Sequence, residues 1–332
     1  MFGPCHHPHT DAFPAMIPGT GIQPCCLQGF KAAGSPAGTM GVRIAGLNCY
    51  VSKPGKTAGA KGGSRALVLC PDIFGAQFIN AQLVADRFAA AGYLAVLVDY
   101  FGGTPLPPAV LEAMMTLSRP DLVTPAGEQP SLFNTVFTWG WRKAQAVAQL
   151  LIHVPPFFMR QGKAPPKGRG QLAEVRALVA ELRAGTQGFD PVTKVGAVGF
   201  CWGGGYALCL SGCLSDSLAS SRTLPDADLE PVVDAFAVAH TEVKVPDFLT
   251  GLACPGLFIA ADKDFAFPDA AVDQARQVLD GLQAQGRGPF KLNKYPGTFH
   301  GFVTRGDEHD QVIRAAKEDA LKEMIAWFDA HM

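Results

Sequence analysis

The chain has 332 residues, of which 48% are hydrophobic and 17% charged, and its formal net charge at pH 7 is −1. This composition provides a large buried core and excludes an intrinsically disordered protein. Because the sequence has no basic stripe and no apolar run of roughly 18 residues, neither nucleic acid nor a membrane is expected as a partner.

The first segment, residues 1–37, is rich in proline, glycine, histidine and cysteine and shows little periodicity. Its possible metal ligands are Cys5, His6, His7, His9, Cys25 and Cys26. They match no common zinc spacing, and the adjacent Cys25 and Cys26 are poorly placed to bind one metal together. We therefore expect an arm that is poorly ordered or packs on the domain, without a metal. The nine cysteines form no regular framework and no secretory leader is evident. We expect reduced thiols in a cytoplasmic protein, which leaves an organellar location open.

Residues 38–332 are expected to form one domain in which short apolar strands alternate with amphipathic helices. The first half is expected to hold a hairpin or two short strands within 42–51, a strand at 66–70, a helix from 79 that ends at Gly92, and a strand at 94–98. The second half is expected to begin with a helix at 171–184, a strand at 194–200 and a helix from Tyr206. Strands at 232–238 and 256–260, a helix at 269–284, a strand at 290–295 and a helix at 310–330 complete the expected elements. Continuous apolar strands between such helices imply an α/β fold with a mostly parallel central sheet and helices on both faces.

An insertion rich in proline and glycine interrupts this alternation at about 102–170. Within it, residues 131–151 could hold a helix. The insertion either covers the functional site or is an inert surface excursion.

The sequence Val-Gly-Ala-Val-Gly-Phe-Cys-Trp-Gly-Gly-Gly at 195–205 places Cys201 between glycines at the end of an apolar strand. This pattern predicts a nucleophile elbow, a sharp strand-to-helix turn that exposes its central residue above the sheet. The start of the following helix would favour the thiolate form of Cys201. A small buried cysteine is the alternative interpretation of this residue alone.

A cysteine nucleophile needs a base and an acid, and in parallel sheets such groups follow strands. His240 and His300 are the histidines that follow expected strands, and Asp262 and Asp264 follow the strand at 256–260. The order cysteine, aspartate, His300 is that of the α/β hydrolases, whereas His240 precedes both acids. The oxyanion hole is expected from the N–H of Trp202 and from a loop amide after the first long strand, that of Ile73.

With these residues assembled, the chain resembles the dienelactone hydrolase family of α/β hydrolases over roughly residues 38–330. Four segments carry the resemblance: Pro71-Asp72-Ile73-Phe74-Gly75, Gly199-Phe200-Cys201-Trp202-Gly203-Gly204, Lys263-Asp264-Phe265-Ala266-Phe267-Pro268 and His300-Gly301-Phe302. The resemblance implies an α/β-hydrolase fold. It also selects Asp264 rather than Asp262 as the acid, because the family's aspartate stands four residues before the proline.

The resemblance also shows two departures near the expected substrate site. Family members often carry a glutamate that accepts a hydrogen bond from the resting thiol, and the shorter Asp72 matches that position, where it could instead be a turn residue. The bacterial enzymes bind a substrate carboxylate with arginines, one of them shortly after an Asp-x-Tyr segment, where this chain has Phe101 and no arginine. Arg305 could supply a guanidinium or be a plain surface residue. Together with His240, Asp72 and Arg305 are assigned to substrate binding.

The sequence therefore predicts a monomeric hydrolase that opens lactones or cleaves esters of small molecules through Cys201, His300 and Asp264 and a thioester acyl-enzyme. No metal or organic cofactor is expected. A general carboxylesterase or thioesterase without dienelactone activity is an alternative. So are a non-catalytic ligand-binding member of the fold and a redox-sensing thiol.

Overall fold

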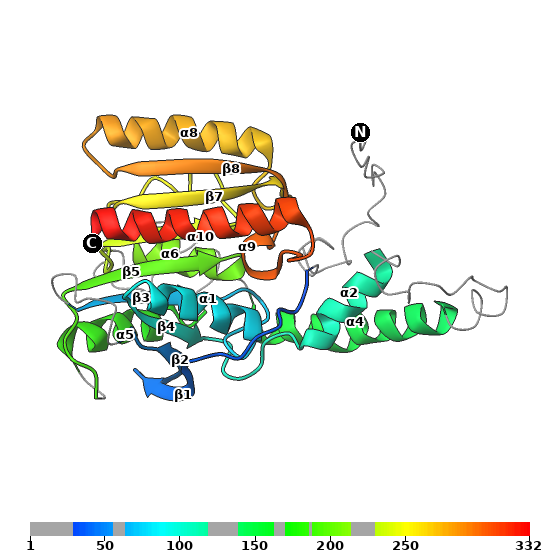
Figure 1. Ribbon diagram of the computed structural model, residues 1–332. Coiled ribbons are helices and arrows are strands. Elements are labelled where there is room, and N and C mark those ends of the chain that lie inside the picture. Colours follow the sequence, from blue (N-terminus) through cyan, green and yellow to red (C-terminus); the bar gives the residue numbers. More distant parts are fainter. Residues whose placement is uncertain (1–28, 56–63, 119–138, 163–169, 186–187, 214–229) are drawn as a thin grey trace.

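The computed structural model describes residues 29–55, 64–118, 139–162, 170–185, 188–213 and 230–332 (Figure 1). Its centre is an eight-stranded sheet with the strand order β1-β2-β4-β3-β5-β6-β7-β8. The first two strands, β1 (Thr39–Ile44) and β2 (Leu47–Ser52), form an antiparallel hairpin, and β2 pairs antiparallel with β4 (Leu94–Asp99). The other strands run parallel to β4: β3 (Arg65–Cys70), β5 (Lys194–Phe200), β6 (Ala235–Ala239), β7 (Gly256–Lys263) and β8 (Phe290–Phe299).

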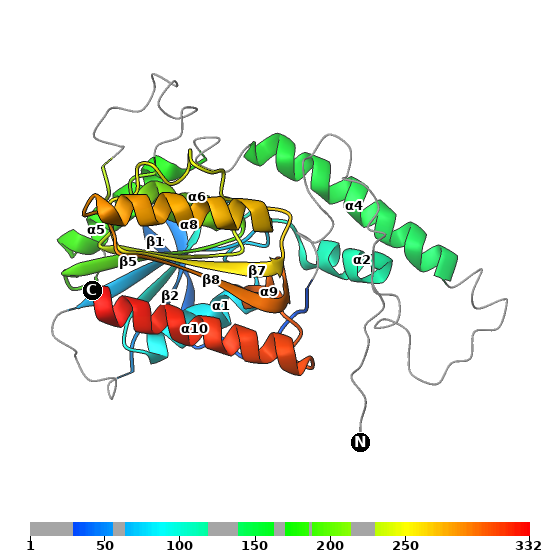
Figure 2. The same ribbon diagram turned by 90° about the horizontal axis from the view of Figure 1, so that it is seen from above.

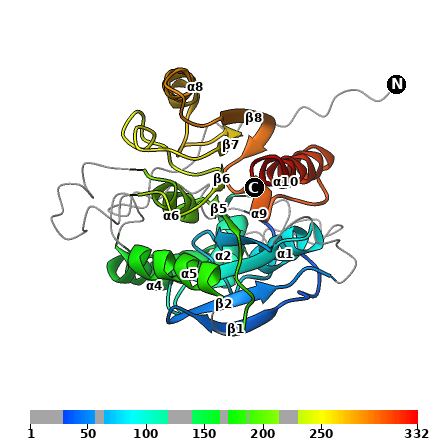
Figure 3. The same cartoon turned by 90° about the vertical axis from the view of Figure 1, so that its left-hand side faces the viewer.

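Helices cover both faces of this sheet, as Figures 2 and 3 show. One face is covered by α5 (Leu172–Ala184), α6 (Trp202–Leu210) and α8 (Asp269–Ala284), and the other by α1 (Ile79–Ala90) and α10 (Gln311–His331). Alternate residues of a strand point to opposite faces. The buried residues accordingly fall into two apolar clusters, with Val68 of β3 in one and Leu67 in the other. The predicted α/β class, mostly parallel sheet and two-sided helix cover are confirmed.

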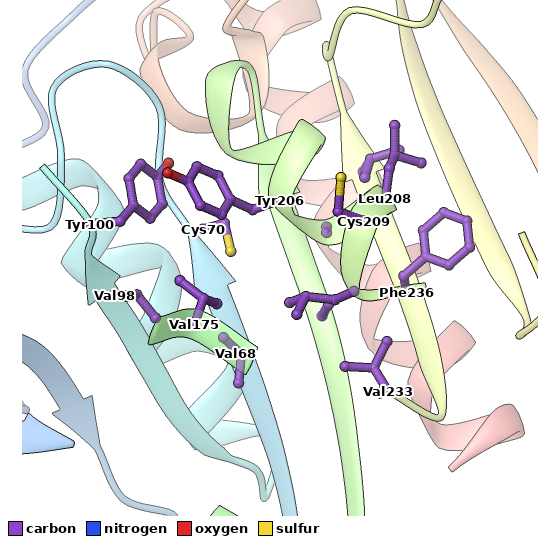
Figure 4. Packing of buried hydrophobic residues seen from close by; sticks show 14 of the residues in the cluster. Val68, Cys70, Val98, Tyr100, Val175, Tyr206, Leu208, Cys209, Val233 and Phe236 are labelled. Atoms are coloured by element: carbon purple, nitrogen blue, oxygen red, sulfur yellow. The ribbon is translucent and has the colours of Figure 1, made fainter. Parts of the chain in front are cut away.

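The apolar cluster on the α6 side ends in a stacked pair of tyrosines (Figure 4). The ring centroids of Tyr100, which follows β4, and Tyr206 of α6 lie 4.2 Å apart at an interplanar angle of 19°. The hydroxyl of Tyr100 donates a hydrogen bond to the carbonyl oxygen of Pro71, which follows β3. The segments that follow β3 and β4 are therefore joined to each other and to α6, beside the elbow that connects β5 to α6.

Among the predicted boundaries that differ from the structure, two are wrong for identifiable reasons. The strand expected at 232–238 begins at Ala235, because the residues before it bond elsewhere: Val232 N–H donates to Leu210 of α6, and the carboxylate of Asp234 accepts from Val195 N–H. The helix expected from Tyr206 begins at Trp202, so three glycines lie inside its first turns. At Gly203 and Gly204, neighbouring atoms lie so close that a side chain would not fit.

The insertion contributes two helices, α2 (Pro108–Ser118) and α4 (Trp139–Gln161), which pack together beyond the carboxyl ends of the strands (Figures 1 and 2). The helix expected within 131–151 continues ten residues further, through two prolines, and its first expected residues lie outside the described ones. At its end, Gln161 donates a hydrogen bond of 3.0 Å to the hydroxyl of Thr104 in the loop after β4. No helix among the described residues is long and apolar enough to cross a membrane.

The arm expected at 1–37 is described only from residue 29. From there it packs on the domain: Asn80 of α1 accepts from Ala32 N–H at 2.9 Å and donates to the carbonyl of Phe30 at 2.7 Å. Phe30 N–H donates in turn to the carbonyl of Arg305. The segment after residue 28 is thus tied to the same edge of the molecule as the loop that follows β8.

Candidate active site

Cys201 stands at a sharp turn between β5 and α6 with φ +52° and ψ −115°, a region that non-glycine residues rarely adopt. The turn is held on both sides, since Cys201 N–H donates to the carbonyl of Ala239 at 3.1 Å and Thr241 Oγ1 donates to the Cys201 carbonyl at 2.7 Å. A Cβ atom at Gly203 would overlap the backbone of Cys70, and one at Gly204 would overlap the side chain of Thr241. These close approaches require glycine in the first turn of α6.

The side chains of Asp264, His300 and Cys201 form one line of contacts. Nδ1 of His300 lies 2.9 Å from Oδ1 of Asp264, and Nε2 lies 3.0 Å from Sγ of Cys201. Asp264 directly follows β7, and His300 directly follows β8. His300 and Asp264 are buried, whereas Cys201 is partly exposed. A base, its orienting acid and an accessible sulfur therefore meet at the carboxyl ends of three parallel strands.

The electrostatics of this line favour a protonated histidine. Burial lowers the pKa of His300, but the negative charges of Asp264 and Cys201, with their hydrogen bonds, outweigh burial and raise the pKa to about 10. An imidazolium beside Sγ stabilises the thiolate form of the sulfur. The N-terminus of α6, at which Cys201 stands, acts in the same direction.

Asp262, the other acid considered from the sequence, lies in a different environment. Its carboxylate pairs with Lys294 of β8 at 2.8 Å and accepts the N–H of Gly297 at 3.1 Å. Asp264 accepts instead from Ala266 N–H and contacts His300. Of the two aspartates, Asp264 is the one beside the histidine.

The two amides expected to form an oxyanion hole come from the elbow and from the loop after β3. Trp202 is the first residue of α6, so its N–H has no acceptor within the helix. In the loop after β3, the N–H groups of Phe74 and Gly75 donate to Asp72, while Ile73 N–H has no acceptor among the described residues. Both amides are thus available to an oxyanion.

The sequence analysis placed Arg305 at an accessible position, and the structure contradicts this. Arg305 is fully buried: its Nε lies 2.9 Å from Oδ2 of Asp72, and its guanidinium packs over the ring of Phe74. Thr304 Oγ1 donates to the same carboxylate oxygen at 3.2 Å. Arg305 is therefore neither a surface residue nor, in this structure, in reach of a substrate carboxylate.

Asp72 is buried beneath the site and forms a turn, because its Oδ1 accepts Phe74 N–H at 3.0 Å. Burial raises the pKa of Asp72, Arg305 lowers it, and the charge of Cys201 raises it further. Its environment matches the turn role considered from the sequence. Its negative charge also reaches Cys201.

His240 was grouped with the substrate-binding residues, but it is fully buried, with φ +41°. Its ring packs edge-on against His300 and Phe302, with centroids 5.3 and 6.1 Å away. Neither ring nitrogen has a hydrogen-bond partner among the described residues. Burial lowers the pKa of His240, and the positive charges of His300 and Arg305 lower it further. A neutral ring behind His300 shapes the site without contacting substrate.

The sequence analysis missed two contributors. Thr241, which holds the elbow carbonyl, follows His240 directly, and its place after a buried strand was the available signal. Phe157 and Phe158 of α4 pack on Trp202, and the two prolines before them hid the continuation of the helix expected within 131–151. Among the described residues, no group of three or more histidine, cysteine, aspartate or glutamate side chains could hold a metal ion. The histidines and cysteines at 5–26 lie outside those residues.

Comparisons with known proteins agree with this architecture. The sequence model of the "Dienelactone hydrolase family" matches residues 171–332. The chain is 28% identical over 316 residues to "Hydrolase tropI" of Talaromyces stipitatus, covering 93% of this chain and 96% of the relative. It is 26% identical over 307 residues to "Dienlactone hydrolase 1" of Gibberella moniliformis, covering 92% of each.

Among solved structures, a putative dienelactone hydrolase from Klebsiella pneumoniae superposes with a TM-score of 0.52 at 16% identity, covering 85% of this chain and 92% of that one. At this identity the likeness concerns the fold. The resemblance predicted from the motifs is confirmed: the half of the chain that carries Cys201, Asp264 and His300 matches the dienelactone hydrolase family, on an α/β-hydrolase fold.

Proposed function

We propose that the protein hydrolyses carboxylic ester bonds, in lactones or esters of the dienelactone type, with Cys201 as nucleophile, His300 as base and Asp264 as orienting acid. One observation carries the proposal: the unbroken line of contacts from Asp264 through His300 to the partly exposed sulfur of Cys201. A packing role for Cys201 alone would need neither of the other two residues.

In the first half of the reaction, His300 holds the thiol proton on Nε2 and the thiolate attacks the carbonyl carbon, forming a C–S bond and a tetrahedral oxyanion. The N–H groups of Ile73 and Trp202 stabilise that charge. The oxyanion then collapses, the ester C–O bond breaks, and the departing alkoxide or enolate takes the proton from Nε2. A thioester on Cys201 remains.

In the second half, His300 removes a proton from water as the water oxygen attacks the thioester carbonyl. The C–S bond breaks, the carboxylic acid leaves, and the sulfur and His300 return to their paired state. Asp264 keeps the proton-carrying Nδ1 of His300 oriented and stabilises the imidazolium, as the acid does in a serine triad.

A second candidate, a general carboxylesterase or thioesterase, is favoured by the burial of Arg305. A dienelactone carries a carboxylate, and here the guanidinium considered as its partner, that of Arg305, is paired with Asp72. Enols and other good leaving groups suit a thiolate nucleophile in either case. We also propose a small-molecule substrate, a monomeric enzyme and a cytoplasmic location. The insertion helix α4 would cover one part of the site, since Phe157 and Phe158 pack on Trp202.

Intact-protein mass spectrometry during turnover of a p-nitrophenyl ester and of an enol lactone tests the mechanism. We expect acyl mass on the wild type and none on Cys201→Ala, with product formed by the wild type alone. Cys254→Ala, which alters a buried thiol elsewhere in the core, should keep both adduct and turnover. An adduct that persists in Cys201→Ala would assign the nucleophile elsewhere, and no adduct with any ester would favour a binding role.

A further inference from the structure

Four aromatic rings form a cluster around Trp202, the residue that follows Cys201 in the chain. Trp202, the residue after the nucleophile, has its ring centroid 5.7 Å from Phe158, 5.8 Å from Phe157 and 6.1 Å from Phe101. Phe157 in turn lies 5.3 Å from Phe101 and 5.0 Å from Phe158. The elbow, the loop after β4 and the insertion helix α4 thus supply one aromatic cluster.

The cluster has a buried layer and an accessible layer. Phe101 and Phe157 are each 3% exposed, whereas Trp202 and Phe158 are partly exposed. Outside this cluster, Phe265 is 36% exposed and its ring centroid lies 5.0 Å from that of His300. Accessible rings therefore lie next to both the nucleophile's neighbour, Trp202, and the base, His300, and the buried layer supports Trp202 and Phe158.

The position of this cluster next to the residue that follows the nucleophile favours contact with the acyl part of a substrate. In the proposed mechanism the acyl group stays on Cys201 through both half-reactions, next to Trp202. The charged group that could attract a carboxylated acyl chain, Arg305, is buried and paired with Asp72. The surroundings of the acyl group are consequently aromatic and uncharged at these residues.

We propose that the site selects esters or lactones whose acyl part carries an uncharged aryl group, packed against the accessible faces of Trp202 and Phe158. This rests on the proposed function and names its substrate class. Aromatic pairs prefer offset or edge-to-face contact and contribute beyond the area they bury. A cyclohexyl group of similar size buries comparable apolar area but lacks the ring quadrupole, so it isolates the aromatic contribution.

The test compares trifluoroethyl esters that share one uncharged, non-aromatic leaving group: 3-phenylpropanoate, 3-cyclohexylpropanoate and the hemisuccinate. Hydrolysis is followed by titration of the released acid. We expect kcat/KM for the phenyl ester to exceed that for the cyclohexyl ester by about three- to tenfold. The hemisuccinate should be the slowest of the three.

The matched variants are Phe158→Leu and Met159→Leu, neighbours on α4 of which Met159 is 87% exposed and outside the cluster. Phe158→Leu should bring the phenyl-to-cyclohexyl ratio close to one, and Met159→Leu should leave it unchanged. Equal rates in the wild type, a preference for the hemisuccinate, or a ratio unaffected by Phe158→Leu would overturn the inference while ester hydrolysis persists. Failure of the proposed function would look different, because no ester would then leave acyl mass on Cys201.

Discussion

Replacing Asp264 by asparagine removes one charge from the centre of the site and changes its shape little. Oδ1 of Asp264 contacts His300 Nδ1 and accepts Ala266 N–H, both at 2.9 Å. The amide oxygen of asparagine can keep these contacts. Its NH2 group then takes the place of Oδ2, which is buried without a hydrogen-bond partner among the described residues. If the amide group is instead rotated by about 180°, its NH2 faces Nδ1 and favours the wrong tautomer of His300.

The charge itself sets the magnitude. Two unit charges about 4 Å apart attract by about 4 kcal/mol at an effective dielectric constant of about 20, which corresponds to a factor of about 1000 in an equilibrium. Asp264 and His300 are both buried, so solvent screens this attraction little. We expect Asp264→Asn to lower kcat/KM for a p-nitrophenyl ester by about 1000-fold.

The same variant should change how Cys201 reacts with iodoacetamide, measured by mass on the peptide that contains it. In the wild type the pKa of His300 is raised to about 10, so the imidazolium persists below that pH and alkylation should be nearly constant from pH 7 to 9. In Asp264→Asn the rate should be low at pH 7 and rise with pH, like that of a thiol with a pKa of about 8.5. Asp262→Asn, which loses an ion pair with Lys294, is the control and should keep the wild-type profile. Activity of Asp264→Asn within threefold of wild type, or an unchanged profile, would refute the argument.

Three further outcomes follow from the packing around the site. Gly204→Ala should destabilise the protein by about 1–3 kcal/mol in thermal unfolding, because the new Cβ overlaps Thr241, whereas Gly140→Ala, with no atom nearby in α4, should be neutral or slightly stabilising. Arg305→Met should lower the free energy of unfolding in urea by about 3–5 kcal/mol at pH 7, because it leaves the buried carboxylate of Asp72 unpaired. Since burial already raises the pKa of Asp72, protonation at low pH should shrink that deficit, and adding Asp72→Asn should recover part of it at pH 7.

The positions of strands and helices could be predicted where one pattern of apolar residues runs through the whole element. The β5 strand and α8 have the predicted bounds, because apolar residues in them follow one pattern from end to end. The prediction failed where close packing overrides propensity. Glycine disfavours helix in isolation, so α6 was expected to begin after its glycines. In the structure their missing side chains allow α6 to approach β3 and Thr241, and the helix begins four residues earlier.

The residues of the candidate site likewise divide into those that could be predicted from the sequence and those that could not. Residues that follow strands converge because parallel strands end at one edge, which is why Cys201, Asp264 and His300 could be grouped from sequence. Burial of a charged side chain has no such signature. Arginine is rarely buried without a partner, and the partner of Arg305 lies more than 200 residues away in the loop after β3. A single sequence contains no trace of that pairing, so both alternatives considered for Arg305, a substrate-binding guanidinium and a plain surface residue, left it accessible.

That pairing also connects the two loops on which the chemistry depends. Asp72 holds the loop of Ile73 through Phe74 N–H, and it is held in turn by Thr304 and Arg305, which follow His300 by four and five residues. The amide expected to bind the oxyanion and the expected base are thus joined through one buried carboxylate. Because this arrangement keeps the carboxylate of Asp72 inside the protein, the guanidinium of Arg305 that neutralises it is buried as well. The guanidinium is therefore not exposed to a substrate. In our proposal, the aromatic rings around Trp202 meet the acyl group in place of that guanidinium.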